Sequence, residues 1–506
     1  MKLSRRSILQ ASLGLTQTAL LGKFGLLGRP ARAADGGSAS KLLTVFMPGG
    51  WMPIYLWCPL SDFEISGYIP PINETSFQEP VFFTPREVTN LDGSINALEG
   101  PYQRLRVPNL WNRQSGRTSP HGRAWEYFRL WENCTVVHGI DQGTAAHDAG
   151  AVCALSGVAG TDFRSPSVNA MAANGLFSRF ENRRPLPSIV LGIALHPEAV
   201  QLRSEVAPTE IGAVADLRYG LSEDISRAWD GLRDREPRQQ YDFAGRPTTT
   251  FGTNAIEDRR SARLRAFRGR STPDTDAFLE KLYNSYQGVS KLLARDIMQE
   301  MSAIPDYPRT RTLDWVIGDT DFAFPSSDGS DPYGLFNLTL KLLKSDLATS
   351  VAIQVPVQNL DTHTEGHGIQ FLRERAAFDA VGRLLGIMKN SPASGGSGSL
   401  LDETLVLIIS EFSRTWPRSN TCDHWPATSV AFVGGGVAPN RMIGGYHITS
   451  GAPISSVGFV GQEVAFDDGS RRQPRAADVV HTALRIMGIQ DFFIPGGSNE
   501  IIGVRA

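Results

Sequence analysis

The sequence predicts an α/β protein with one mostly parallel central sheet that helices cover on both faces. Continuous apolar runs, which are typical of buried parallel strands, alternate with helical patterns. The runs that we expect to form strands are 42–47, 135–140, 188–195, 351–357, 404–410 and 428–433. Helical patterns lie at 147–156, about 276–302, 335–348, 369–389 and 475–488. This alternation favours a sheet sandwiched between two helical layers.

The length and charge of the chain limit its class and its partners. At 506 residues the chain can bury a sizeable core. Its 50 Lys and Arg nearly balance its 52 Asp and Glu, so no net field would draw it to nucleic acid or to anionic lipid. We therefore expect no nucleic-acid partner, and any function must be argued from a site.

The N-terminus has the pattern of a twin-arginine export signal. Arg5 and Arg6 precede a moderately apolar stretch that ends in the small-x-small sequence Ala31–Arg32–Ala33. We expect residues 1–34 to be a cleaved signal peptide, with export of the folded protein through the twin-arginine translocase. The mature protein would then be periplasmic or extracellular and have no membrane span. An uncleaved amphipathic anchor is the alternative.

The rest of the chain, 40–506, is expected to form one domain with two insertions. Residues 51–120 are rich in Pro, Asn and aromatic residues, which predicts an irregular excursion after the first strand. Residues 205–270 are polar and rich in arginine, which predicts a helical cap over about 205–310 or simply a solvated face. The cysteines, which form no CxxC pair and leave any disulfide pairing open, are Cys58, Cys134, Cys153 and Cys422.

Titratable side chains gather at the predicted strand ends, where ligands bind in open parallel sheets. They are Asp141, His147 and Asp148 after 135–140, Asp361, His363, Glu365 and His367 after 351–357, Glu411 after 404–410, and Asp423 and His424 before 428–433. Carboxylates and imidazoles suit zinc, manganese or iron and can leave positions open for water or substrate. The alternative is that they are ordinary polar loop residues, with His147 capping its helix.

The order of these motifs resembles the bacterial family called domain of unknown function 1501. The motifs are Gly49–Gly50, His147 through Leu155–Ser156–Gly157, Asp361–Thr362–His363, Ser410–Glu411–Phe412–Ser413–Arg414–Thr415 and Asp423–His424–Trp425. The resemblance extends from the signal to the helix near residue 488, and the last two motifs are its most specific part. It implies a fold like that of the alkaline phosphatase and sulfatase superfamily, whose metal ligands and nucleophile lie at strand ends.

The resemblance also implies a set of metal ligands. Asp361 matches the acidic ligand that follows one strand, and His363 or His367 matches the histidine downstream of it. Glu411 matches a second acidic ligand, and His424 matches the final histidine. Asp423 would orient His424 or bind the metal. The ion would be divalent zinc, manganese, iron or calcium.

Two positions depart from the superfamily pattern. The nucleophile, a Ser, Thr or modified Cys, is expected about ten residues before Gly157, where this chain has His147. The acidic ligand after the first strand is replaced by Gly49–Gly50–Trp51, so one of two metal sites is incomplete. His147 could bind metal, attack phosphorus to form a phosphohistidine, or bond a carboxylate as a structural residue. Thr144 is a weaker alternative nucleophile.

Arg414 has two interpretations, because it could bind an anionic substrate oxygen or pair with Glu411. Together these features predict an exported metal-dependent hydrolase, sulfatase-like, that acts on a small phosphate or sulfate ester. The alternative is a non-catalytic secreted envelope protein that keeps the fold for binding or assembly. In that case the candidate residues should lie far apart or be occupied by salt bridges. An oxidoreductase is disfavoured because no strand is followed by a G-x-G-x-x-G nucleotide-binding sequence.

Overall fold

The computed structural model describes a large part of the chain after the predicted signal. The described residues are 39–57, 85–87, 106–108, 125, 128–160, 165–180, 184–192, 202, 209–211, 332–355, 360–363, 366–395, 397–417, 423–449 and 456–506. The signal 1–34, the helix expected at 276–302, most of both insertions, Cys58, Glu365 and Cys422 lie outside them. From Ala39 onward the described residues belong to one compact unit, Ser38–Ala506.

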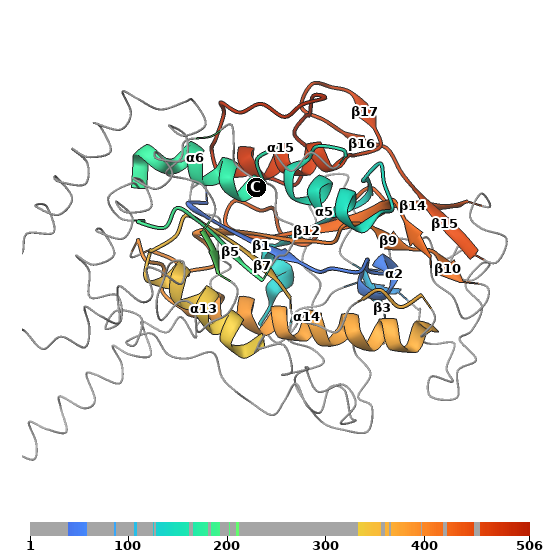
Figure 1. Ribbon diagram of the computed structural model, residues 1–506, viewed down its shortest axis with the longest axis horizontal. Coiled ribbons are helices and arrows are strands. Elements are labelled where there is room, and N and C mark those ends of the chain that lie inside the picture. Colours follow the sequence, from blue (N-terminus) through green and yellow to red (C-terminus); the bar gives the residue numbers. More distant parts are fainter. Residues whose placement is uncertain are drawn as a thin grey trace, which may run out of the picture. The chain divides into compact units, whose positions relative to one another are not determined.

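An eight-stranded sheet forms the centre of the described part, in the order β13-β4-β12-β8-β1-β7-β5-β6 (Figure 1). Its strands are β1 (Lys41–Phe46), β4 (Cys134–Asp141), β5 (Ser188–Leu191), β6 (Thr209–Ile211), β7 (Ser350–Gln354), β8 (Thr404–Ile409), β12 (Ala427–Gly434) and β13 (Arg441–Ile443). Within this sheet β12 alone runs against the others. The predicted mostly parallel sheet is confirmed, but the run 428–433, which the sequence groups with the parallel strands, is antiparallel.

The direction of β12 has a consequence for the site. Because β12 runs antiparallel to β4 and β8, it begins at the edge of the sheet where those strands end. Ala427, its first residue, pairs with Asp141, the last residue of β4. Residues that precede β12 therefore reach the same edge as residues that follow the parallel strands.

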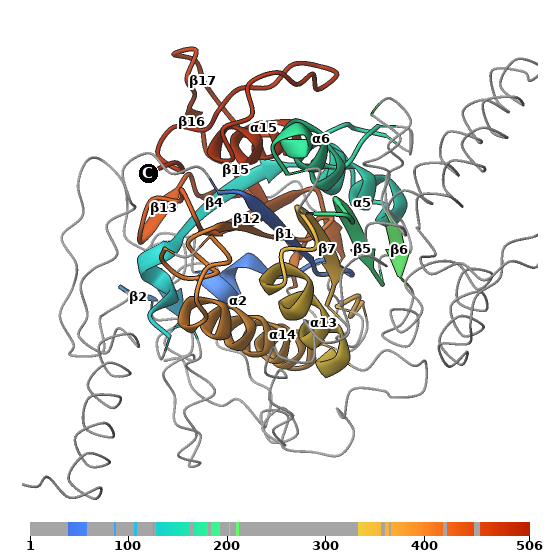
Figure 2. The same ribbon diagram turned by 90° about the vertical axis from the view of Figure 1, so that its left-hand side faces the viewer.

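Helices cover both faces of the sheet (Figures 1 and 2). One face packs against α2 (Pro53–Trp57), α13 (Pro332–Lys344) and α14 (Gly366–Asn390), and the other packs against α5 (His147–Ser156), α6 (Val168–Phe180) and α15 (Ala476–Ile486). Alternate residues of β1 supply the two cores, since Leu43 belongs to the first and Leu42 to the second. All six residues of β1 are buried, which explains its continuous apolar pattern.

The predicted helices are present where the chain is described, with shifted ends in three cases. The helix expected at 147–156 has these bounds in the structure, and it ends at Gly157, whose φ of 75° is the usual left-handed cap. Helix α6 was not predicted.

Among the described residues, no helix combines the length and apolar character that a bilayer crossing needs. Cys134 and Cys153 are buried free thiols.

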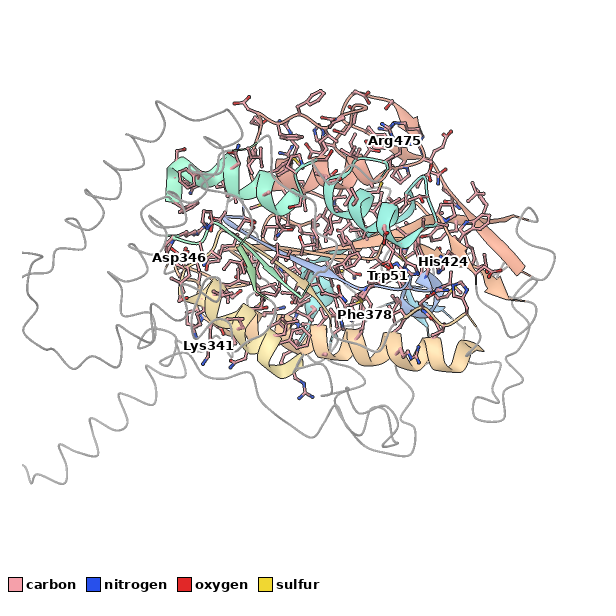
Figure 3. The ribbon with its side chains drawn as sticks, in the orientation of Figure 1. Trp51, Lys341, Asp346, Phe378, His424 and Arg475 are labelled. Atoms are coloured by element: carbon pink, nitrogen blue, oxygen red, sulfur yellow. The ribbon has the colours of Figure 1, made fainter. Side chains whose placement is uncertain are left out.

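Short strands form one three-stranded sheet and several two-stranded pairs outside the main sheet. They are β2 (Pro85–Glu87), β3 (Arg106–Pro108), β9 (Ser413–Arg414), β10 (Trp416–Pro417), β11 (His424–Trp425), β14 (Tyr446–Thr449), β15 (Ser456–Gly461), β16 (Val464–Ala465) and β17 (Arg471–Arg472), with a 3-10 turn at Leu130–Asn133. The pair β9 and β11 matters most, because it places His424 opposite Arg414. Figure 3 shows His424 and Trp51 together, at the end of the sheet remote from Asp346.

Candidate metal centre

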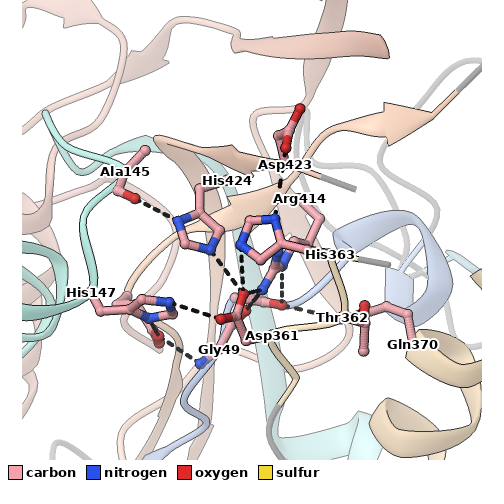
Figure 4. Close-up of polar contacts among 12 residues, drawn as sticks. Gly49, Ala145, His147, Asp361, Thr362, His363, Gln370, Arg414, Asp423 and His424 are labelled. Atoms are coloured by element: carbon pink, nitrogen blue, oxygen red, sulfur yellow. Dashed lines mark hydrogen bonds and ion pairs between the residues drawn. The ribbon is translucent and has the colours of Figure 1, made fainter. Parts of the chain in front are cut away.

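His147, Asp361 and His424 meet at the carboxyl edge of the sheet (Figure 4). His147 is the first residue of α5, Asp361 lies in the connection between β7 and α14, and His424 begins β11. One possible ligand atom from each lies within 4.8 Å of the other two. The Asp361 carboxylate is 2.9 Å from His424 Nε2 and 3.3 Å from His147 Nε2. This His–Asp–His group could bind a metal ion.

The other ring nitrogen of each histidine contacts a fixed oxygen. His424 Nδ1 lies 2.8 Å from the carbonyl of Ala145, and His147 Nδ1 lies 3.0 Å from Glu411 Oε1. A carbonyl can only accept a hydrogen bond, so Nδ1 of His424 must carry the proton. The same tautomer suits His147 beside a carboxylate. Nε2 of each ring then faces Asp361. It donates a hydrogen bond to this carboxylate when the ring is protonated, and in the neutral ring its lone pair could bind a metal ion instead.

The ring of His424 is held by strand pairing and by aromatic contact. Its neighbour Trp425 pairs with Ser413 and donates from Nε1 to the carbonyl of Phe459 at 2.5 Å. The Phe412 ring lies 4.2 Å from the His424 ring, at an angle of 31° between their planes. Because neighbouring elements fix both the backbone and the ring, His424 presents Nε2 in a defined direction.

Arg414 holds Asp361 from the inner side of the site. Its side chain is fully buried at 0% exposure and forms an ion pair with Asp361. Its Nε also donates to the carbonyl of Gly49 at 3.0 Å. The ion pair that the structure describes is with Asp361, which is neither the substrate oxygen nor the Glu411 carboxylate that the sequence offered as partners. Because its guanidinium binds the Gly49 carbonyl and the Asp361 carboxylate, Arg414 can orient that carboxylate.

The charges around Asp361 keep it ionised. Partial burial acts to raise the pKa of Asp361, but the hydrogen bond with His424 and the bond and charge of Arg414 outweigh it. The pKa of this carboxyl therefore lies well below its usual range. An ionised carboxylate between two imidazoles is a suitable ligand for a divalent ion.

Glu411, which the sequence predicts as a second acidic ligand, contacts the Nδ1 atom of His147. Its side chain is 2% exposed, and its Oε1 accepts a hydrogen bond from the amide of Gly49 at 2.6 Å and contacts His147 Nδ1. It is not a member of the three-residue group. Its position corresponds to the carboxylate that supports a metal-binding histidine in other proteins.

The Gly49–Gly50 turn serves the site through its backbone. Gly49 gives its amide to Glu411 and its carbonyl to Arg414. Gly50 has a φ of 76°, and a Cβ there would lie 2.5 Å from the ring of Phe412. Glycine is therefore required at Gly50 by both conformation and space. The motif that lacked an acidic ligand in the sequence supplies main-chain hydrogen bonds instead.

The remaining predicted residues lie around this group or outside what is described. His363 Nε2 is 3.0 Å from Asp361 Oδ1, and its Nδ1 is 3.7 Å from Asp423 Oδ1. These two side chains are 43% and 48% exposed, so both are open to solvent. His367 is in the first turn of α14, but its side chain lies outside the described part. The Thr144 hydroxyl accepts from the amide of Ala146 at 3.1 Å.

The two histidines differ in their affinity for protons. The hydrogen bond with Glu411 raises the pKa of His147, although partial burial opposes it. Burial lowers the pKa of His424, and the positive charge of Arg414 lowers it further. Together these effects outweigh the hydrogen bond with Asp361, which acts to raise the pKa. Protons therefore compete with a metal ion for His147 more strongly than for His424.

Comparisons with other proteins give only distant similarity. No protein-family model and no curated protein matches the sequence. A phosphonate monoester hydrolase, SpPMH from Silicibacter pomeroyi, is 13% identical with a TM-score of 0.24, covering 76% of this chain and 71% of that one. Ps i-CgsB in complex with k-i-k-neocarrahexaose is 9% identical with a TM-score of 0.30, covering 90% and 73%. Similarity this low carries no argument about activity, which must rest on the residues of the site.

Proposed function

We propose that the protein is an exported, metal-dependent hydrolase with an alkaline phosphatase-like fold, acting on a small phosphate or sulfate ester. The observation that carries the proposal is the orientation of His147 and His424, whose Nε2 atoms both face the carboxylate of Asp361. Two imidazoles and one carboxylate are a common ligand set of catalytic metal sites that keep open positions. The twin-arginine pattern at Arg5 and Arg6 supports export to the periplasm or beyond.

The donor atoms fit a divalent transition metal better than calcium. Imidazole nitrogen suits zinc, iron and manganese, whereas calcium prefers six to eight oxygen ligands. His147, Asp361 and His424 would hold the ion, whereas His363 contacts Asp361 at 3.0 Å but is not a member of the three-residue group. When bound, such an ion would polarise an ester oxygen and lower the pKa of a water molecule.

The start of α5 supports an anionic substrate. His147 is the first residue of this helix, and its N-cap residue, Ala146, makes no side-chain capping bond. The amide groups and the dipole at a helix N-terminus favour negative charge, part of which Asp148 in the first turn already supplies. An ester with a phosphate or sulfate group would place its charge beside these amides and the metal ligands.

The geometry bears on the role of His147 in the reaction. Only Nε2 of His147 faces the group, because Nδ1 is bonded to Glu411. That atom cannot bind an ion and attack phosphorus at the same time, so we assign His147 to the metal and not to a phosphohistidine. Thr144 is bonded to the backbone of its own turn. We therefore propose water as the attacking group.

A non-catalytic envelope protein is the second candidate function. It is favoured by the ion pair between Asp361 and the buried Arg414, and by the lack of a hydroxyl or thiol at position 147. It is disfavoured because the candidate residues converge instead of lying apart. The two functions differ in whether the cluster binds metal and turns over an ester.

An activity assay tests the proposal. The purified protein, supplied in turn with zinc, manganese and iron, would be assayed with a chromogenic aryl phosphate and the matching aryl sulfate. We expect hydrolysis of at least one ester that depends on the metal and is lost in His424→Ala, with circular dichroism unchanged. If neither ester is hydrolysed and no metal is bound, the proposal is wrong and the non-catalytic function is preferred.

A further inference from the structure

The first half of α14 has two buried polar side chains, Gln370 and Glu374, to which the proposed reaction gives no role. They are four residues apart and so lie on the same side of the helix. Both are fully buried at 0% exposure. Polar groups in such a place are costly unless they are hydrogen-bonded, so their partners indicate what they do.

The partners of this pair belong to two separate segments. Gln370 Nε2 donates to the carbonyl of Gly50 at 3.1 Å, and Gln370 Oε1 accepts from the hydroxyl of Thr362 (Figure 4). Glu374 Oε1 accepts from the amide of Met52 at 2.6 Å and from Gln370 Nε2 at 2.5 Å. The pair thus bonds both to the turn after β1 and to the connection that follows β7.

Both segments position residues of the metal centre. Thr362 directly follows Asp361, so its bond fixes the backbone that carries the metal-binding carboxylate. The turn at Gly49 supplies the amide that holds Glu411 and the carbonyl that holds Arg414. A shift of either segment would move Asp361 relative to the histidines.

We propose that Gln370 and Glu374 are positioning residues that fix the distance between the Asp361 segment and the Gly49–Gly50 turn, and so set the affinity of the site for metal. This inference rests on the metal site of the proposed function. The pair touches none of the three candidate ligands in the contacts described, and it acts through Thr362 and the backbone.

The hydrogen bonds of Glu374 use only one of its two carboxyl oxygens. Both of its donors point to Oε1, while Oε2 is buried without a partner among the described residues. Burial raises the pKa of Glu374 well above its usual value, and the bonds from Gln370 and Met52 only partly oppose this. A glutamine in its place would keep the accepting oxygen and the size of the side chain.

The test compares the affinity for zinc of four variants by competition with a chelating dye. Gln370→Ala and Glu374→Leu should bind zinc about 10- to 100-fold more weakly, as outer partners of metal ligands do when mutated. Glu374→Gln should bind as the wild type does. Thr482→Ala is the control, because this buried hydroxyl in α15 accepts from the amide of Ile501 at 2.9 Å, far from the site in the chain. It should lower the melting temperature and leave the affinity unchanged.

Hydrogen exchange of the metal-free protein gives a second readout. Glu374→Leu should remove the protection of the Met52 amide, and Gln370→Ala should speed exchange around Thr362. If zinc affinity and exchange are both unchanged in these variants, the positioning role is wrong, even where Asp361→Ala still abolishes binding. If the wild type binds no zinc, the metal site itself fails, and the exchange data alone decide whether the pair holds the two segments together.

Discussion

Replacing Glu411 with glutamine tests whether this carboxylate orients His147 or binds the ion itself. Glu411 Oε1 lies 3.0 Å from His147 Nδ1 and 2.6 Å from the amide of Gly49. Glutamine has nearly the same size and one accepting oxygen, but it lacks the charge. Because the bond with Glu411 is the main cause of the raised pKa of His147, that pKa should fall in Glu411→Gln.

The size of the effect on metal binding separates the two roles. Loss of an outer carboxylate that supports a histidine ligand lowers metal affinity about 10- to 100-fold, or about 1.4 to 2.7 kcal/mol. This agrees with the value of about 1.5 to 3 kcal/mol for a hydrogen bond to a charged group. If Glu411 were a ligand, its loss should instead match that of Asp361→Ala or His424→Ala.

Isothermal titration with zinc at constant pH would measure these affinities, and proton NMR of the histidine rings would follow the pKa of His147. Glu463→Gln is the control, since it removes an equal charge from an exposed residue. An affinity equal to the wild type would refute the orienting role. A loss as large as that of His424→Ala would refute it too, by showing that Glu411 is a ligand.

Two further predictions concern the support of the site and the stability of the fold. Gly50→Ala should destabilise the protein by more than the roughly 1–2 kcal/mol of a left-handed alanine, because its Cβ would also lie 2.5 Å from the Phe412 ring. Urea unfolding would measure this against Gly143→Ala, whose φ is 67° but whose Cβ would meet nothing within 4 Å, and equal losses would contradict the steric argument. Burial lowers the pKa of His138 from 6.5 to about 3, so the unfolded chain takes up this proton first as pH falls. The free energy of unfolding therefore loses nothing to this group above about pH 6.5 and falls towards pH 3 by at most about 1.4 kcal/mol per pH unit. His138→Asn, whose amide lies near the place of Nδ1 and can keep the bond to Ser429, should reduce that slope.

Much of the fold follows from patterns that a sequence displays. Long apolar runs predict buried strands because both faces of this sheet are covered, and the six runs coincide with β1, β4, β5, β7, β8 and β12. The direction of β12 could not be predicted, since a strand that is apolar on both faces has no periodicity that distinguishes its orientation. Helix α6 was missed because Asn169 and Asn174 interrupt its apolar pattern.

The site could be predicted in its location but not in its division of roles. The sequence places Asp361 and His424 at strand ends of one sheet, and the topology brings them together. His147 and Glu411 both belong to residue types that bind metals. Only their geometry shows that His147 is part of the three-residue group and that Glu411 contacts the other nitrogen of its ring. The amide of Gly49 holds Glu411 and the carbonyl of Ala145 holds His424, and such main-chain contacts cannot be recognised in a sequence motif.

The metal content of the purified protein tests the central claim most directly. After loading with zinc and removal of the excess, elemental analysis should find about one ion per chain in the wild type. His424→Ala and Asp361→Ala should lose it, while Asp141→Ala, which removes another carboxylate at a strand end, should keep it. A wild type without bound metal, or an unchanged content in His424→Ala and Asp361→Ala, would contradict the account.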